Sequence, residues 1–162
     1  MTVRHHQFAA VSILLAGVVV LLAWGRSMGV DSSAIARDRD RFQGRWVATR
    51  IQAGNGLTME GAKAATCRVE FAGNLAHFVG LIDQPEAEGT CYLEQQGDYN
   101  RVDFRLDAGW IIGIYAFEGD RLKLAINPFA PPERLGVPTR PRPRQLKPAE
   151  GTIYYEFRRD NP

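Results

Sequence analysis

Residues 110–126 read WIIGIYAFEGDRLKLAI, which is two apolar runs joined by the turn residues Glu118-Gly119-Asp120. In the second run, leucine and isoleucine at positions 122, 124 and 126 alternate with basic residues at 121 and 123. A period of two places alternate side chains on opposite faces of a strand, one face buried and one in water. The short polar link favours an antiparallel hairpin.

The same alternation recurs outside this hairpin. It predicts eight strands in all, separated by turns rich in glycine, asparagine and aspartate. The other candidate strands are GRWVATRI from Gly44, TCRVEF from Thr66, NLAHFVG from Asn74, GTCYLE from Gly89, residues 102–106 and residues 153–157. Only Gly56 to Ala65 leaves room for a brief helix.

Eight short antiparallel strands must hide their edges by stacking as a sandwich or by closing into a barrel. Closely spaced hairpins build an up-and-down meander most simply, because sequential strands usually lie side by side. The sequence therefore predicts an all-β domain over residues 41–159, folded as an eight-stranded antiparallel up-and-down barrel. The 162 residues allow one such domain.

The N-terminal residues indicate export. Residues 8–24 (FAAVSILLAGVVVLLAW) carry no charge and lie between Arg4 and Arg26. This pattern predicts a signal peptide or signal-anchor helix within residues 1–27, with the domain outside the cytoplasm. An uncleaved anchor would hold the domain at the cytoplasmic membrane, and a cleaved signal would release it to the periplasm or the medium. Length alone does not decide between them.

Residues 28–40 (MGVDSSAIARDRD) lack sustained apolar periodicity and predict a tether between the membrane and the domain. Without residues 1–27, which hold Arg4 and Arg26, the chain has 18 basic and 18 acidic residues. A neutral domain exerts no overall attraction on phosphate, so nucleic acid is not an expected partner.

The chain has two cysteines, Cys67 and Cys91, and an oxidising compartment permits a disulfide between them. If a third strand separates theirs, the two Cα atoms lie about 10 Å apart, beyond the reach of a disulfide. Both a bridge and two separate core thiols therefore stay open.

No catalytic or metal-binding constellation is evident in the sequence. His77 is the only histidine outside the leader, and there is neither a GxSxG motif nor a glycine-rich phosphate loop. Glu118 and Asp120 flank Gly119, where carboxylates ordinarily stabilise a turn. We therefore expect no enzyme, no metal and no cofactor.

The predicted barrel interior is the candidate ligand site. A barrel of eight strands is just wide enough for side chains to fill it or for one small ligand to enter. The expected binding partner is a small apolar or amphipathic molecule. The residues expected to face inward are Trp46, Val69, Phe71, Ile112, Ile114, Leu122, Leu124, Ile126, Tyr155 and Phe157.

A second candidate site is the segment of residues 127–148, which is rich in proline and basic residues. Proline excludes a central strand here and favours extended backbone. Arg140, Arg142 and Arg144 are its candidate contact residues. The alternative function is accordingly a structural or protein-interaction module of the cell envelope, and the alternative structural reading is an ordinary solvated loop.

Three stretches resemble a known family. RFQGRW at residues 41–46 resembles the opening LxGxW strand of lipocalin-like domains, and GIYAFEGDRLKL at residues 113–124 resembles their GIYxxxGDxLKL hairpin. Arg140-Pro141, Lys147-Pro148 and Gly151 resemble the approach to the last strand in a small extracytoplasmic family abundant in planctomycete bacteria. The resemblance implies a lipocalin-like barrel and no established activity.

Overall fold

The computed structural model describes residues 32–81, 86–96, 99–130 and 141–160. The chain divides into two units, residues 1–32 and residues 33–162. The predicted signal or anchor over residues 8–24 lies outside the described residues. In the part that is described, no helix combines the length and the apolar character needed to cross a membrane.

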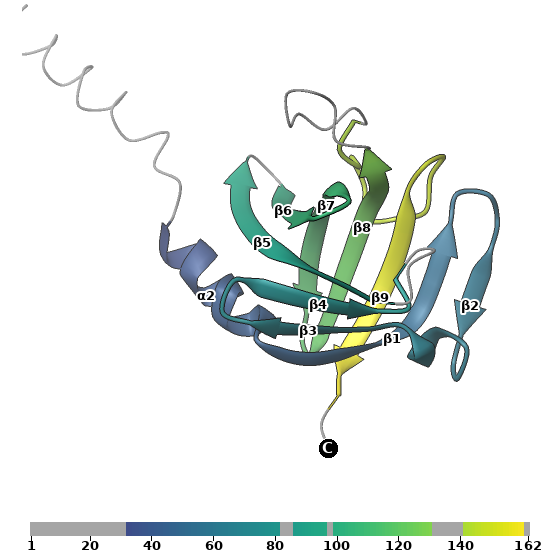
Figure 1. Cartoon of the computed structure of the whole chain (residues 1–162), viewed down its shortest axis with the longest axis horizontal. Coiled ribbons are helices and arrows are strands. Elements are labelled where there is room, and N and C mark those ends of the chain that lie inside the picture. Colours follow the sequence, from purple (N-terminus) through teal and green to yellow (C-terminus); the bar gives the residue numbers. More distant parts are fainter. Residues whose placement is uncertain (1–31, 82–85, 97–98, 131–140, 161–162) are drawn as a thin grey trace, which may run out of the picture. The chain divides into compact units, whose positions relative to one another are not determined.

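All eight predicted strands are present, and the structure adds one short strand and one helix (Figure 1). The elements are α2 (Ser32–Phe42), β1 (Gly44–Ala53), β2 (Thr58–Glu60), the 3-10 turn η1 (Ala64–Thr66), β3 (Arg68–Ala72), β4 (Leu75–Val79), β5 (Glu86–Gln96), β6 (Tyr99–Leu106), β7 (Gly109–Glu118), β8 (Arg121–Ala130) and β9 (Ile153–Arg159).

The strands close into an eight-stranded antiparallel barrel. Each of β3 to β8 pairs with the next strand along the chain, and β1 pairs with β3 on one edge and with β9 on the other. The β1–β9 register runs from Trp46 opposite Arg159 to Ala53 opposite Ile153, with a bulge between Ala48 and Arg50. The extra strand β2 pairs with β1 beyond the end of β3.

Two segments differ from the sequence prediction. Within the expected tether of residues 28–40, the described part belongs to helix α2, whose Phe42 is buried in the core. Within Gly56 to Ala65, the backbone forms strand β2, and only the turn η1 is helical. Both segments are short and carry few apolar residues, so their periodicity gives little signal.

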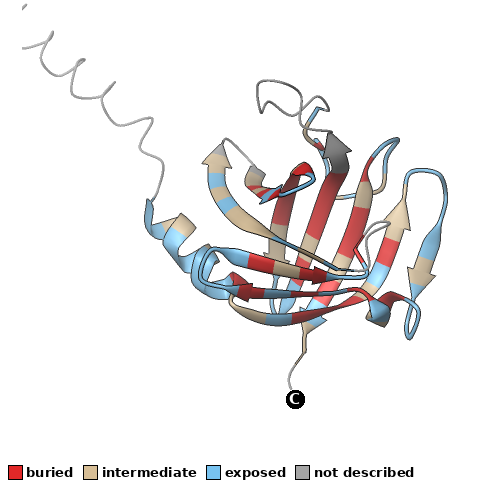
Figure 2. Ribbon diagram, in the orientation of Figure 1, coloured by how far each residue is buried: buried red, intermediate tan, exposed pale blue. Residues whose placement is uncertain are grey.

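The barrel centre is filled by side chains. Eight of the residues expected to face inward belong to one buried cluster with at most 3% of their surface exposed: Trp46, Val69, Phe71, Leu122, Leu124, Ile126, Tyr155 and Phe157. The buried bands on β7, β8 and β9 are visible in Figure 2. Side chains buried to this degree pack against one another and fill the space between them.

The other two residues expected inside, Ile112 and Ile114, lie on the outer face, and that prediction was wrong. Ile114 packs with Ala125, Tyr154 and Leu146 in a second buried cluster outside the barrel. Strand β7 is apolar on both faces, because Leu146 and Arg142 from the segment before β9 pack on its outside. Alternation alone cannot then tell which of the two sets of alternate residues on β7 points into the barrel.

One end of the barrel is closed by α2 and its connection to β1. The Phe42 ring makes edge contacts with Phe71, Tyr115 and Phe117, at centroid distances of 4.9, 4.8 and 5.1 Å. The indole of Trp46 donates a hydrogen bond to the carbonyl of Phe42 at 2.7 Å. The helix thus contributes core as well as covering the end of the sheet.

Candidate functional site

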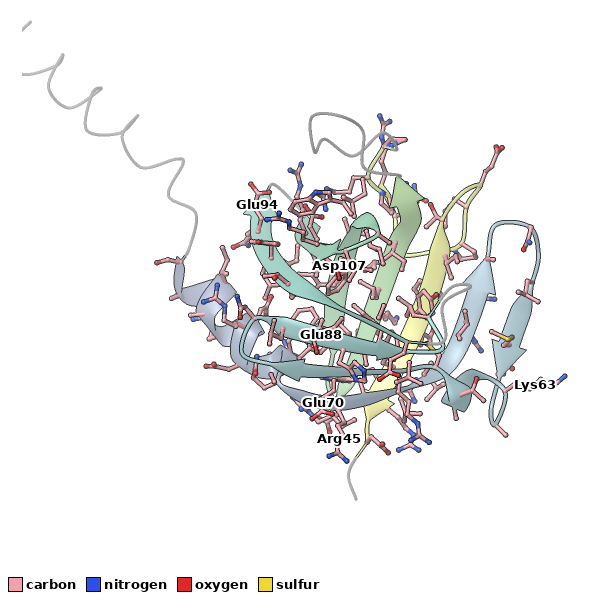
Figure 3. All side chains as sticks on the ribbon, viewed as in Figure 1. Arg45, Lys63, Glu70, Glu88, Glu94 and Asp107 are labelled. Atoms are coloured by element: carbon pink, nitrogen blue, oxygen red, sulfur yellow. The ribbon has the colours of Figure 1, made fainter. Side chains whose placement is uncertain are left out.

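Strand β5 has a free edge at the α2 end of the barrel. It pairs with β4 only through Glu86 to Thr90, whereas its pairing with β6 extends from Gly89 to Gln96. From Tyr92 onward, no described residue pairs with the β4-facing edge. Figure 1 shows β5 continuing past β4 on the side where α2 lies, and Figure 3 labels Glu94 on this part of the strand.

The inward-facing side chains of β5 are less buried than those of its neighbours. Cys91, Leu93 and Gln95 are half-buried, whereas Val102 and Phe104, directly opposite on β6, are buried completely. In Figure 2, the described part of β5 carries the intermediate and exposed colours and no buried band. The free edge therefore coincides with the part of the barrel interior that solvent reaches.

Polar side chains converge beside this free edge from one helix and three strands. Gln95 on β5 is opposite Asn100 on β6, which is opposite Tyr115 on β7. The Tyr115 hydroxyl donates to Oδ2 of Asp38 on α2 at 2.8 Å, and Nδ2 of Asn100 donates to the same oxygen at 3.4 Å. We call Asp38, Cys91, Leu93, Gln95, Asn100 and Tyr115 the α2–β5 site.

Two acceptors in the α2–β5 site keep bonding capacity. Oε1 of Gln95 is buried and has no hydrogen-bond partner among the described residues. The second carboxylate oxygen of Asp38, Oδ1, lies 4.0 Å from Nη1 of Arg41, which is longer than a hydrogen bond. A buried acceptor without a partner costs free energy, so such an atom calls for an explanation.

Burial and the Asp38 contact set the protonation state of Tyr115. Desolvation is the largest cause of a raised pKa, and the hydrogen bond to Asp38 and its negative charge raise the Tyr115 pKa further. The hydroxyl therefore stays protonated and remains a donor to Asp38. The tyrosine therefore positions the Asp38 carboxylate.

Both cysteines are free thiols, which is the second of the two alternatives that the sequence left open. Cys67 precedes Arg68, which pairs with Val79 at one end of β4, whereas the Cys91 amide bonds the carbonyl of Asn74 at the other end. About six extended residues, or about 20 Å, separate these two levels along β4. Burial raises the pKa of each thiol to about 12, which makes neither a ready nucleophile.

The Pro/Arg-rich segment is held against the barrel where it is described. Arg142 makes a two-pronged ion pair with Asp103 at 2.5 and 2.8 Å and donates to the carbonyl of Gly113 at 2.6 Å. Arg142 is therefore not a free contact residue, which corrects that part of the interaction-loop prediction. Arg144 is exposed, and Arg140 lies outside the described residues.

The remaining chemical candidates lie apart from one another. Nε2 of His77 is 2.7 Å from Oε1 of Glu86 on the outside of the barrel, and Glu118 pairs with Lys123 at 2.5 Å. Asp120 is exposed at the same turn as Glu118. Within the described ranges, no group of three or more histidine, cysteine or acidic side chains is placed to hold a metal ion.

The polar residues of the α2–β5 site were not singled out by the sequence reasoning. Gln95 and Asn100 interrupt an otherwise apolar inward alternation, Cys91-Leu93 on β5 and Val102-Phe104-Leu106 on β6. That interruption is a readable signal of a polar group directed into a barrel. Asp38 carries no such signal, because its place depends on how α2 packs.

Comparisons with protein-family models, with curated proteins and with solved structures found no match for this chain.

Proposed function

We propose that this protein is a ligand-binding barrel held outside the cytoplasm, and that it takes one small amphipathic molecule at the α2–β5 site. The observation that carries the proposal is the half-buried inner face of β5 beside an edge without a strand partner. Apolar surface and polar groups meet there, as they do in most small-molecule sites. The export signal and the lipocalin-like resemblance in the sequence belong to the same proposal.

The site has an apolar and a polar part. Leu93 and Cys91 pack against the edge of the core cluster and offer an apolar wall to a short hydrocarbon chain. Gln95, Asn100 and Asp38 lie toward the α2 end and offer polar contacts to a head group. The filled barrel centre limits the depth of entry, so a short chain is expected rather than a long one.

The two thiols provide a test in the full-length chain embedded in lipid nanodiscs. We expect decanol or decylamine at about ten times its dissociation constant to slow the alkylation of Cys91 by about tenfold, since only about a tenth of the sites stay empty. Cys67 is the internal reference, because it lies at the other end of β4. Alkylation at pH 9, with peptide mapping by mass spectrometry, reports both rates.

The matched control is Leu75→Ser, on the exposed outer face of β4. It should leave the protection of Cys91 unchanged. Unaltered alkylation of Cys91 with every amphiphile would refute the proposal. Equal slowing at both cysteines would refute it too, because that result indicates general stabilisation of the fold and not occupancy of the α2–β5 site.

A further inference from the structure

Gln95 suggests which head group the site selects, an inference that rests on the proposed function. Its Oε1 is buried and lacks a hydrogen-bond partner among the described residues, on a strand whose inner face solvent reaches. An acceptor in this state gains most from a ligand that donates a hydrogen bond. A ligand head that only accepts would leave Oε1 unsatisfied.

The carboxylate of Asp38, which lies in the same site as Gln95, also favours a ligand that donates hydrogen bonds. The Tyr115 hydroxyl donates to Oδ2 of Asp38, and the Asn100 amide directs one of its two N–H groups to the same oxygen. Oδ1 of Asp38 adds acceptor capacity, because Arg41 approaches it only to 4.0 Å. The α2–β5 site thus contains two acceptors with unused bonding capacity.

We infer that the α2–β5 site selects amphiphiles whose head group donates hydrogen bonds, a hydroxyl or an ammonium group, and that Gln95 is the specificity-determining residue. The two heads share the donor chemistry but differ in charge. An ammonium head gains additionally from the negative charge of the Asp38 carboxylate, whereas a hydroxyl head has no charge and gains only the hydrogen bond.

The test compares ten-carbon ligands that differ only at the head, with the full chain in nanodiscs and Cys91 protection as the readout. Decanol donates and decyl methyl ether only accepts. We expect decanol to bind about tenfold more tightly, the effect of one buried hydrogen bond that the ether leaves unmade. Decylammonium should bind at least as tightly as decanol.

Three substitutions assign the preference to Gln95. Gln95→Met keeps the size of the side chain and should remove the difference between decanol and the ether. Gln95→Glu should increase the preference for decylammonium over decanol. Gln52→Met, the same change on the outer face of β1, should leave the tenfold difference intact.

The melting temperature of the ligand-free protein supplies an independent readout. Removing a buried acceptor without a partner should leave the melting temperature of the ligand-free Gln95→Met protein unchanged or raised. A lowered melting temperature would mean that Gln95 is a structural residue and would overturn the inference. Equal binding of decanol and the ether to the unmodified protein would also overturn it while leaving the proposed function standing, whereas no binding of any ligand would remove both.

Discussion

At the scale of single residues, Arg142 converts a proline-rich segment into part of the barrel. Its guanidinium engages both carboxylate oxygens of Asp103 on β6 and the carbonyl of Gly113 on β7. Both partners of the ion pair are largely shielded, with side-chain exposures of 22% and 25%. A planar guanidinium can satisfy these acceptors together, and an ammonium group on a lysine cannot do so in the same geometry.

We expect Arg142→Ala to lower the free energy of unfolding by about 2 to 3 kcal/mol, because it leaves the Asp103 carboxylate without its partner. Arg144→Ala, on an exposed side chain two residues away, should change it by less than about 0.5 kcal/mol. Urea unfolding of the two variants measures the difference. Equal losses in both would show that the ion pair does not hold the segment.

Glycine has a comparable structural role at one position in β7. A Cβ added at Gly113 would lie 2.8 Å from the backbone oxygen of Ala125, closer than real Cβ atoms come to such an atom. The absence of a side chain there lets β7 and β8 approach and leaves the carbonyl of Gly113 open to Arg142. Gly113 thus serves both the close packing of β7 against β8 and the hydrogen bond from Arg142 on the outside.

At the scale of elements, helix α2 is joined to the barrel by Phe42 and Asp38. We expect Phe42→Ala to cost about 3 to 5 kcal/mol, the usual loss for a large aromatic ring removed from a packed core. Ile35→Ala, on a half-buried residue of the same helix, should cost clearly less. Denaturant unfolding tests this, and a loss below about 1 kcal/mol for Phe42→Ala would show that α2 is not part of the core.

The strands could be predicted from the sequence, whereas their packing partners could not. Alternation located β8 and β9 because Arg121, Lys123 and Glu156 mark the wet face. It assigned the wrong face to Ile112 and Ile114 because β7 has apolar residues on both sides. Packing of α2 brings Asp38 to Tyr115, 77 residues away, and no local pattern encodes such a distant contact.

At the scale of the whole molecule, the buried Cys67 thiol and the half-buried Cys91 thiol make stability depend on pH in the alkaline range. The pKa of each is raised from 9.0 to about 12 in the fold. Because the folded pKa lies above the unfolded one, the stabilisation is complete below pH 9 and is lost as pH rises toward 12. In that range, each thiol lowers the free energy of unfolding by about 1.4 kcal/mol per pH unit.

Between pH 8 and pH 10, the unmodified protein should therefore lose about 2 to 3 kcal/mol more unfolding free energy than the double variant Cys67→Ala/Cys91→Ala. Lysines and tyrosines titrate in both proteins, so their contribution cancels in the comparison. Denaturant unfolding at the two pH values measures the difference. Identical pH slopes would contradict the burial of the thiols.

The pairing of the first strand with the last has a consequence for biosynthesis. The side chain of Arg159 crosses that seam, stacking over the ring of Trp46 and bonding the carbonyl of Gln43, a residue 116 positions earlier. The ribosome releases β1 long before β9, so the β9-facing edge of the apolar strand β1 stays unpaired until β9 has been synthesised. Pairing between such distant segments slows folding. The unpaired strand edge exposed in the meantime is the kind of surface that chaperones bind.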